Sequence, residues 1–294
     1  MKMLFVYNPH AGKAQIKNHL WEILDIFTKN GYLVTTYPTQ AQSDAYEKIK
    51  AIGEQYDIVV VSGGDGTLNE GVRGMMELPK RDAPVFGYIP AGTVNDFASS
   101  LGIPKYMPDA AKMIVDGSPF FCDVGKFQEK YFSYVAAFGA FTEVSYETSQ
   151  EQKNMLGNLA YVLQGIKKLS SLTEYALTIR YNRREIEGKF IFGMISNSYS
   201  VAGIKCNDNL KVSLNDGKFE AVFIKVPENL MDIQLMVGDL LRQNFQSPYF
   251  VTFRAKKITI LSEEKVAWTI DGEYGGEYLK TEIEVCPKQL NILV

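Results

Sequence analysis

The chain has 294 residues, of which 46% are hydrophobic and 22% are charged, and its net charge is −3. These proportions are typical of a globular protein with one large or two ordinary domains, and they exclude a disordered or low-complexity chain. The small negative charge argues against a protein that binds nucleic acid through its phosphates. Three widely spaced Cys and two His form neither a disulfide framework nor a zinc motif, so we expect a reducing compartment.

No segment has the length and apolar character of a membrane span or a signal peptide. The apolar start of the chain, residues 3–7, is only as long as a strand and runs directly into Asn8-Pro9. We therefore expect a cytoplasmic protein that is peripheral at the inner face of a membrane.

Strands and helices alternate in the first part of the chain. Continuous apolar runs predict strands, and 3.6-residue periodicity predicts helices between them. The strands are expected at residues 3–7, 32–37, 57–61 and 85–89, and the helices at 14–30, 43–54, 68–77 and 94–101. This order predicts an α/β domain with a parallel sheet and helices on both faces.

The second part of the chain is dominated by strands and predicts a β-rich sandwich domain. Strands are expected at 175–181, 185–196, 218–226, 249–254, 257–261 and 266–270, and helices at 155–169 and 230–245. The boundary is placed between residues 122 and 123, so the second domain spans 123–285. A cleft between two unlike domains is a common ligand site.

The strongest chemical signal is Ser62-Gly63-Gly64-Asp65-Gly66-Thr67, directly after the third strand. Glycines allow close backbone approach, and the free N–H groups of the following helix favour an anion such as phosphate. Asp65 fits this interpretation if Mg²⁺ accompanies the phosphates, since Mg²⁺ prefers oxygen ligands. The alternative is a tight turn in which Asp65 caps the helix.

Two further loops follow the fourth and first strands. Pro90 to Ala98 repeats the pattern of glycine and hydroxyl at a helix start, with Asp96 as a second carboxylate. Asn8 to Lys13 is neither a Walker A motif nor a dinucleotide-binding fingerprint. Because carboxyl ends of parallel strands share one edge of a sheet, all three loops are expected there, although a helix cap alone would explain Thr93 and Asp96.

Acidic residues in the second part of the chain have two interpretations. Asp271-Gly272-Glu273 offers two carboxylates, one of which could accept a proton from a hydroxyl, but Asp-Gly is also a turn dipeptide. The same choice between turn and oxygen-ligand metal site applies to Asp216-Gly217. Asp123 could face the cleft or lie in a turn.

Taken together, these motifs resemble the soluble diacylglycerol kinase and sphingosine kinase family. The order and spacing hold over nearly the whole chain, and the Gly-Asp-Gly-Thr element is shared with NAD kinases and 6-phosphofructokinases. The matching elements are Asn8-Pro-x-Ala-Gly-Lys, Gly63-Gly-Asp-Gly-Thr-Leu-Asn69, Gly92-Thr-x-Asn-Asp-Phe-Ala98, Leu156-Gly-x-Leu-Ala-Tyr-Val-Leu163 and Asp271-Gly-Glu273.

The resemblance implies an ATP-binding first domain, to which a last strand at about 286–294 returns, and a lipid-acceptor second domain. Asp65 and Asp96 would manage the catalytic Mg²⁺, and Glu273 or Asp271 would be the general base, with Glu273 favoured. A structural Mg²⁺ would be held by Asp216 and by main-chain carbonyls of Ser213 and Lys218, with Asp123 linking that ion to the active site. The implied nucleotide contacts are Asn8, Gly12, Thr39, Gly63, Gly64, Asp65, Gly66, Thr67, Asn69 and Thr93.

The expected activity is transfer of the γ-phosphate of ATP to a lipid hydroxyl at a membrane surface, most simply diacylglycerol to phosphatidic acid. A homodimer is implied by resemblance alone. The alternatives are an NAD kinase-like enzyme with a soluble acceptor and a catalytically silent nucleotide or lipid sensor. The sequence departs from the family pattern at Tyr134, at Ser99 and around 202–210, near the acceptor side and the structural-ion loop.

Overall fold

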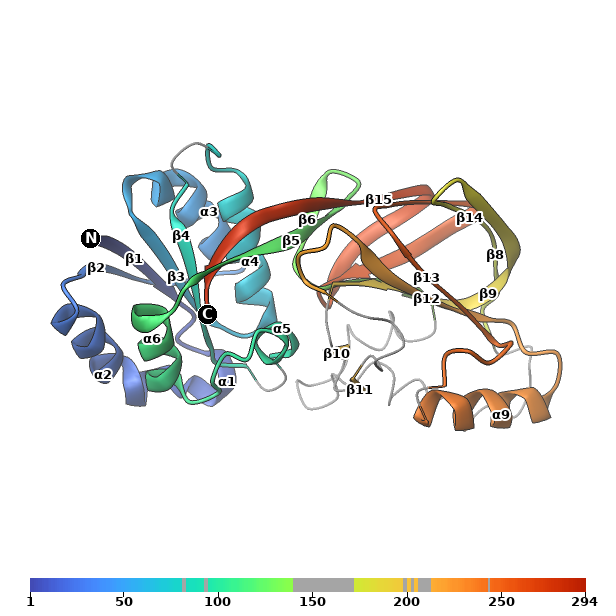
Figure 1. The fold of residues 1–294 in the computed structure, drawn as a ribbon, viewed down its shortest axis with the longest axis horizontal. Coiled ribbons are helices and arrows are strands. Elements are labelled where there is room, and N and C mark those ends of the chain that lie inside the picture. Colours follow the sequence, from blue (N-terminus) through green and yellow to red (C-terminus); the bar gives the residue numbers. More distant parts are fainter. Residues whose placement is uncertain are drawn as a thin grey trace. The chain divides into compact units, whose positions relative to one another are not determined.

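The computed structural model describes residues 1–80, 83–92, 95–139, 172–197, 200–201, 204–205, 213–242 and 244–294. The chain divides into two compact units, which are described separately (Figure 1). Unit 1 comprises Met1–Val124 and Pro287–Val294, and unit 2 comprises Gly125–Cys286.

The sheet of unit 1 is built from parallel pairs. Its strands are β1 (Lys2–Tyr7), β2 (Leu33–Pro38), β3 (Ile58–Gly63) and β4 (Val85–Pro90), in the order β2-β1-β3-β4. Every residue of β3 is buried, which explains its continuous apolar run. The last strand of the chain, β15 (Glu273–Leu293), adds to this sheet by parallel pairing of Ile292 with Phe86.

Two pairs of helices flank this sheet: α2 (Ile16–Lys29) contacts α6 (Met107–Asp116), and α3 (Asp44–Ile52) contacts α4 (Asp65–Met76). Right-handed crossovers in the order β2-β1-β3-β4 place the two pairs on opposite faces, as Figure 1 shows. Two short helices complete the unit, α1 (Ala11–Ala14) and α5 (Asp96–Ser100), and a 3-10 turn (Gly53–Gln55) follows α3.

The helices of unit 1 differ from expectation at several points. The separate short helix α1 was not expected, and the helix expected at 14–30 begins at Ile16. The helix expected from residue 68 begins at Asp65, so Asp65 lies in its first turn. Helix α6 is absent from the sequence-based expectations, although Pro108 in its first turn is a favourable helix start.

The β-rich second part is confirmed in unit 2. Strands β9 (Arg184–Ser196) and β14 (Lys257–Ile270) both pair with β7 (Val135–Gly139) and with β8 (Tyr175–Tyr181). Figure 1 shows the strands wrapping around a common interior. The remaining elements are β5 (Pro119–Phe127), which enters from unit 1, β6 (Lys130–Phe132), β10 (Ser200–Val201), β11 (Ile204–Lys205), β12 (Phe219–Lys225), α9 (Leu230–Leu241) and β13 (Phe250–Ala255).

Alternate residues of β7, β9 and β12 pack into two different hydrophobic clusters. Ala137, Met194 and Val222 share a cluster with the buried face of α9. Ala136 and Ala221 belong to the other cluster, which contains the fully buried Trp268. Both faces of these strands are therefore buried against apolar side chains, which explains their nearly continuous apolar runs.

The strands expected at 257–261 and 266–270 are one strand, β14, whose pairing with β15 shifts between Leu261 and Val266. The helix expected at 155–169 lies outside the described residues. Among those described, no helix has the length and hydropathy needed to cross a membrane.

Candidate functional site

The loops after β1, β3 and β4 lie together at the carboxyl edge of the sheet in unit 1. The backbone N–H of Asn8 donates to the carbonyl of Ser62 at 2.8 Å, and the N–H of Ala91 donates to the carbonyl of Gly63, also at 2.8 Å. These two bonds continue the parallel ladder beyond the strands. They hold the middle loop between its two neighbours.

Glycines allow these loops to approach more closely than any other residue would. A Cβ on Gly92 would lie 2.8 Å from the Cα of Gly64, and a Cβ on Gly12 would lie 1.7 Å from the carbonyl oxygen of Ala91. Gly12 also has a φ of +54°, which an L-residue rarely adopts. A side chain at Gly12 or Gly92 would therefore push the loops apart.

The first five residues of α4 carry three polar side chains next to the middle loop. Asp65, Thr67 and Asn69 are all buried, and the Nδ2 of Asn8 donates to Thr67 Oγ1 at 3.4 Å. A Cβ on Gly63 would lie 2.4 Å from Thr67 Oγ1. The N–H groups in the first turn of a helix have no partner within the helix itself, and a helix start of this kind suits a phosphate.

Tyr88 and Asn95 hold the backbone of the loops after β3 and β4 through hydrogen bonds. The buried Tyr88 hydroxyl donates to the carbonyl of Gly63 at 2.9 Å. The side chain of Asn95 accepts from the N–H of Gly92 at 3.0 Å and donates to its carbonyl at 2.6 Å. Burial, and secondarily the charge of Asp65, raise the pKa of Tyr88 well above its ordinary value, so its hydroxyl keeps its proton.

The loop after β2 is tied to the same helix. Both carboxylate oxygens of Glu70 accept backbone N–H groups, from Ser43 at 2.8 Å and from Ala45 at 3.1 Å. The N–H of Thr39 donates to the carbonyl of Tyr7 at 2.9 Å, which places Thr39 at the same sheet edge. Sequence reasoning missed Glu70 and Tyr88, because each reads locally as an ordinary helix or strand residue.

Asp65 and Asp96 fit a Mg²⁺ that arrives with phosphates. Both are buried carboxylates in the first turn of a helix that follows a glycine loop. In the described part of the chain, no group of three or more His, Cys, Asp or Glu residues could hold a metal. Mg²⁺ in proteins commonly has phosphate and water oxygens among its ligands. Thr93, a predicted nucleotide contact, lies outside the described residues.

In unit 2, Asp271 lies in the turn between β14 and β15 and is bound to the backbone of the segment that leads into β7. Its carboxylate accepts N–H groups from Ser133 at 2.6 Å, Tyr134 at 3.1 Å and Val135 at 2.9 Å. Its own N–H donates to the carbonyl of Val135 at 2.8 Å. These bonds hold the Asp-Gly-Glu turn against the sheet.

Glu273, two residues later, is only half-buried. Its carboxylate has no hydrogen bond or ion pair to any residue that the structure describes. Gly272, between the two acids, has a φ of +86° and open space where a Cβ would be. The turn thus separates a bonded carboxylate from an available one.

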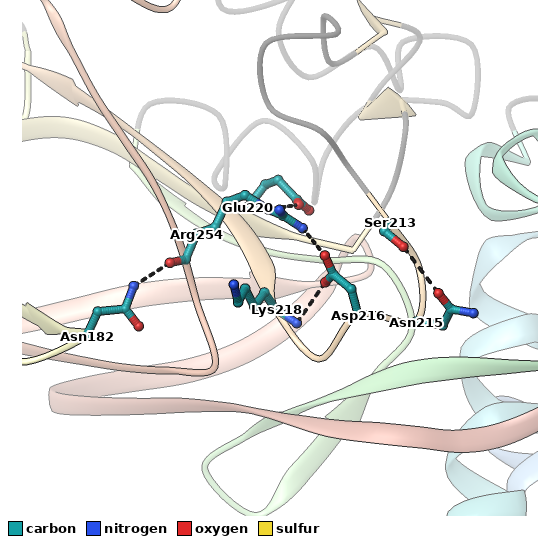
Figure 2. Close-up of polar contacts among 7 residues, drawn as sticks. All are labelled: Asn182, Ser213, Asn215, Asp216, Lys218, Glu220 and Arg254. Atoms are coloured by element: carbon teal, nitrogen blue, oxygen red, sulfur yellow. Dashed lines mark hydrogen bonds and ion pairs between the residues drawn. The ribbon is translucent and has the colours of Figure 1, made fainter.

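Two of the predicted structural-ion residues, Ser213 and Asp216, form hydrogen bonds with neighbouring residues (Figure 2). Asp216 Oδ1 accepts the N–H of Lys218 at 3.1 Å, and Asp216 Oδ2 accepts from Arg254. The Ser213 hydroxyl donates to Asn215 Oδ1 at 3.2 Å. Asp123 belongs to unit 1, where its buried carboxylate accepts the N–H of Lys288 at 2.8 Å and joins β5 to β15.

Comparisons with known proteins agree with this architecture. Residues 2–127 match the family model described as the diacylglycerol kinase catalytic domain. A diacylglycerol kinase from Staphylococcus carnosus (strain TM300) is 36% identical over 95% of this chain and 93% of its own length.

Solved structures of other proteins share the fold of this chain. A proposed diacylglycerol kinase from Bacillus anthracis str. Sterne has a TM-score of 0.84 and 26% identity, covering 99% of this chain and 94% of that one. An NAD kinase from Archaeoglobus fulgidus in complex with ATP shares the fold, with a TM-score of 0.54 and 13% identity over 100% of this chain and 92% of that one. The two-unit kinase fold and the match to a curated relative over nearly its whole length establish that this chain belongs to the diacylglycerol kinase family of lipid kinases.

Proposed function

We propose that the protein transfers the γ-phosphate of ATP to the hydroxyl of diacylglycerol, forming phosphatidic acid at a membrane surface. The observation that carries the proposal is the contact between the glycine loops at the start of α4, where a Cβ on Gly92 would lie 2.8 Å from the Cα of Gly64. A cradle of backbone N–H groups and close-packed glycines is suited to a chain of phosphates. The family membership supports a lipid as the acceptor.

The nucleotide would bind along the carboxyl edge of the unit 1 sheet. The first turn of α4, residues 65–67, would donate its N–H groups to the phosphates, and Asn8 would orient Thr67 toward them. Asp65 and Asp96 would hold Mg²⁺, which when bound offsets the negative charge of the phosphates. Tyr88 and Asn95 would keep the cradle in shape before the nucleotide arrives.

Glu273 is the general base in this proposal. It would accept the proton of the acceptor hydroxyl while the hydroxyl oxygen forms a bond to the γ-phosphorus and the bond to the ADP oxygen breaks. Asp271 is less suited to this step, since its carboxylate accepts three backbone hydrogen bonds that protonation would weaken. Transfer requires Glu273 to reach the phosphate held by unit 1 in the working enzyme.

The test is transfer of labelled γ-phosphate from ATP, with Mg²⁺, to lipids in mixed micelles. The panel contains diacylglycerol, ceramide, a sphingoid base and phosphatidylglycerol, and NAD is offered in a separate reaction. Label in diacylglycerol, lost in Asp65→Ala and Glu273→Gln, is the expected result. Label in NAD would identify a soluble-acceptor kinase, and ATP binding with no labelled product would identify a sensor; either would overturn the proposal.

A homodimer and peripheral membrane association remain predictions. Sedimentation of the wild-type chain tests the first, and co-sedimentation with phospholipid vesicles tests the second. A species with the mass of one chain, or protein that stays in the supernatant, would contradict them.

A further inference from the structure

Arg254 links two acidic side chains in unit 2 through a single guanidinium. Its Nε donates to Glu220 Oε1 at 2.9 Å, and its Nη2 donates to Asp216 Oδ2 (Figure 2). Glu220 and Arg254 lie directly opposite each other on β12 and β13, so the antiparallel register sets up their pairing. Asp216 reaches the same guanidinium from the turn that precedes β12.

The buried carboxylate of Glu220 explains why an Arg stands at position 254. Glu220 is 1% exposed, and its second carboxylate oxygen is buried with no hydrogen-bond partner in the described chain. A buried carboxyl group needs a nearby positive charge or a proton. Arg254 provides the charge and remains one quarter exposed, which allows it to reach Asp216 at the surface.

These contacts do not fit a divalent ion on the Asp216 carboxylate. One of its oxygens already accepts from a cation, and the other accepts the N–H of Lys218 within the same turn. A divalent ion at the free lone pair of Oδ1 would lie beside the guanidinium on the same carboxylate, where like charges repel. Ser213 and Lys218 would offer only neutral main-chain carbonyls, so Asp216 would be the one negative charge among the three expected ligands.

We propose that the Arg254 guanidinium supplies the positive charge that stabilises the turn at residues 213–218, and that this turn keeps its conformation without a bound metal. The guanidinium takes the place of the structural Mg²⁺ that the family resemblance implies. The inference concerns this turn and not phosphoryl transfer, so it stands independently of the proposed function.

The test is hydrogen–deuterium exchange of peptides covering residues 213–220 in the nucleotide-free wild-type chain. Exchange is compared in excess EDTA and in excess Mg²⁺. A local readout is needed because the Mg²⁺ proposed at Asp65 and Asp96 would act in unit 1. The expected result is identical exchange in the two buffers. Slower exchange in Mg²⁺ that Asp216→Asn abolishes would overturn the proposal.

Arg254→Met provides a second, independent readout. Loss of the charged hydrogen bonds should make exchange in 213–220 on the order of tenfold faster, in either buffer. The matched control is Arg180→Met, which removes an exposed Arg paired with Glu185 on neighbouring strands and should leave these peptides unchanged. Wild-type exchange in Arg254→Met would contradict the proposal. If that variant fails to fold, the wild-type comparison still decides.

Discussion

Asp271 and Glu273 lie two residues apart, yet their carboxylates have opposite surroundings. Asp271 is buried and accepts three backbone N–H groups from residues 133–135, whereas Glu273 is half-buried and bonded to none of the described residues. Asp271 is therefore bound to the backbone of the sheet, whereas the Glu273 carboxylate is available to a substrate. This contrast gives the two residues of one short motif different expected phenotypes.

We expect Glu273→Gln to lower kcat by about 10²–10⁴-fold, the usual contribution of a general base, without lowering stability. Asp271→Ala should instead lower the free energy of unfolding by about 2 kcal/mol, because three N–H donors, two of them buried, lose their acceptor. Steady-state phosphate transfer and urea unfolding of both variants separate the two roles. Full activity of Glu273→Gln would rule out its assignment as the base.

The contact between glycine loops predicts that Gly92→Ala weakens ATP binding by at least about tenfold, since a methyl group cannot fit against Gly64 without moving the cradle. The matched control is Gly238→Ala in α9, where a Cβ meets nothing within 4 Å. That change should stabilise the helix by up to about 1 kcal/mol and leave ATP affinity unchanged. Calorimetric titration with ATP measures both. Equal ATP affinities for the two variants would contradict the proposal that the glycine loops bind the phosphates of ATP.

Tyr88→Phe removes the hydroxyl that donates to the carbonyl of Gly63. We expect a loss of about 1 kcal/mol in stability, with a several-fold rise in the dissociation constant for ATP, because the buried carbonyl loses that donor. Tyr32→Phe is the control, since the Tyr32 hydroxyl has no hydrogen bond within the described structure. Thermal unfolding and titration with ATP measure both variants. If Tyr88→Phe and Tyr32→Phe have the same stability and ATP affinity, Tyr88 does not support the nucleotide site.

Burial raises the pKa of Glu220 from 4.5 to about 7, against the opposing effect of Arg254. Between these values the folded chain keeps a proton that the unfolded chain has released, so stability falls as pH rises. The contribution is complete below pH 4.5 and is lost above about pH 7, a difference of about 3 kcal/mol.

Glu220→Gln lacks this titration, and its pH dependence supplies the baseline for the measurement. Between pH 4 and pH 8, the free energy of unfolding of the wild-type chain should decline by about 3 kcal/mol more than that of Glu220→Gln. Denaturant titration at each pH measures the difference. Parallel curves would show that Glu220 does not titrate in this range.

Local patterns predicted most of unit 1 and its glycine loops. The strands β1, β3 and β4 are continuous apolar runs because their sheet is buried on both faces. The three loops that follow them were expected at one edge, since parallel strands end on the same side. By contrast, β14 was divided into two strands because Ser262 to Lys265 reads as a polar turn, although these residues continue the strand.

The contacts that hold the site were outside the reach of local patterns. Tyr88 bonds to a carbonyl 25 residues earlier, Glu70 to an N–H 27 residues earlier, and Arg254 to a carboxylate 38 residues earlier. Amino-acid types and spacing along the chain specify the elements and the chemistry available in each loop. Which donor meets which acceptor depends on crossovers and strand register, since these bring distant segments within hydrogen-bond distance.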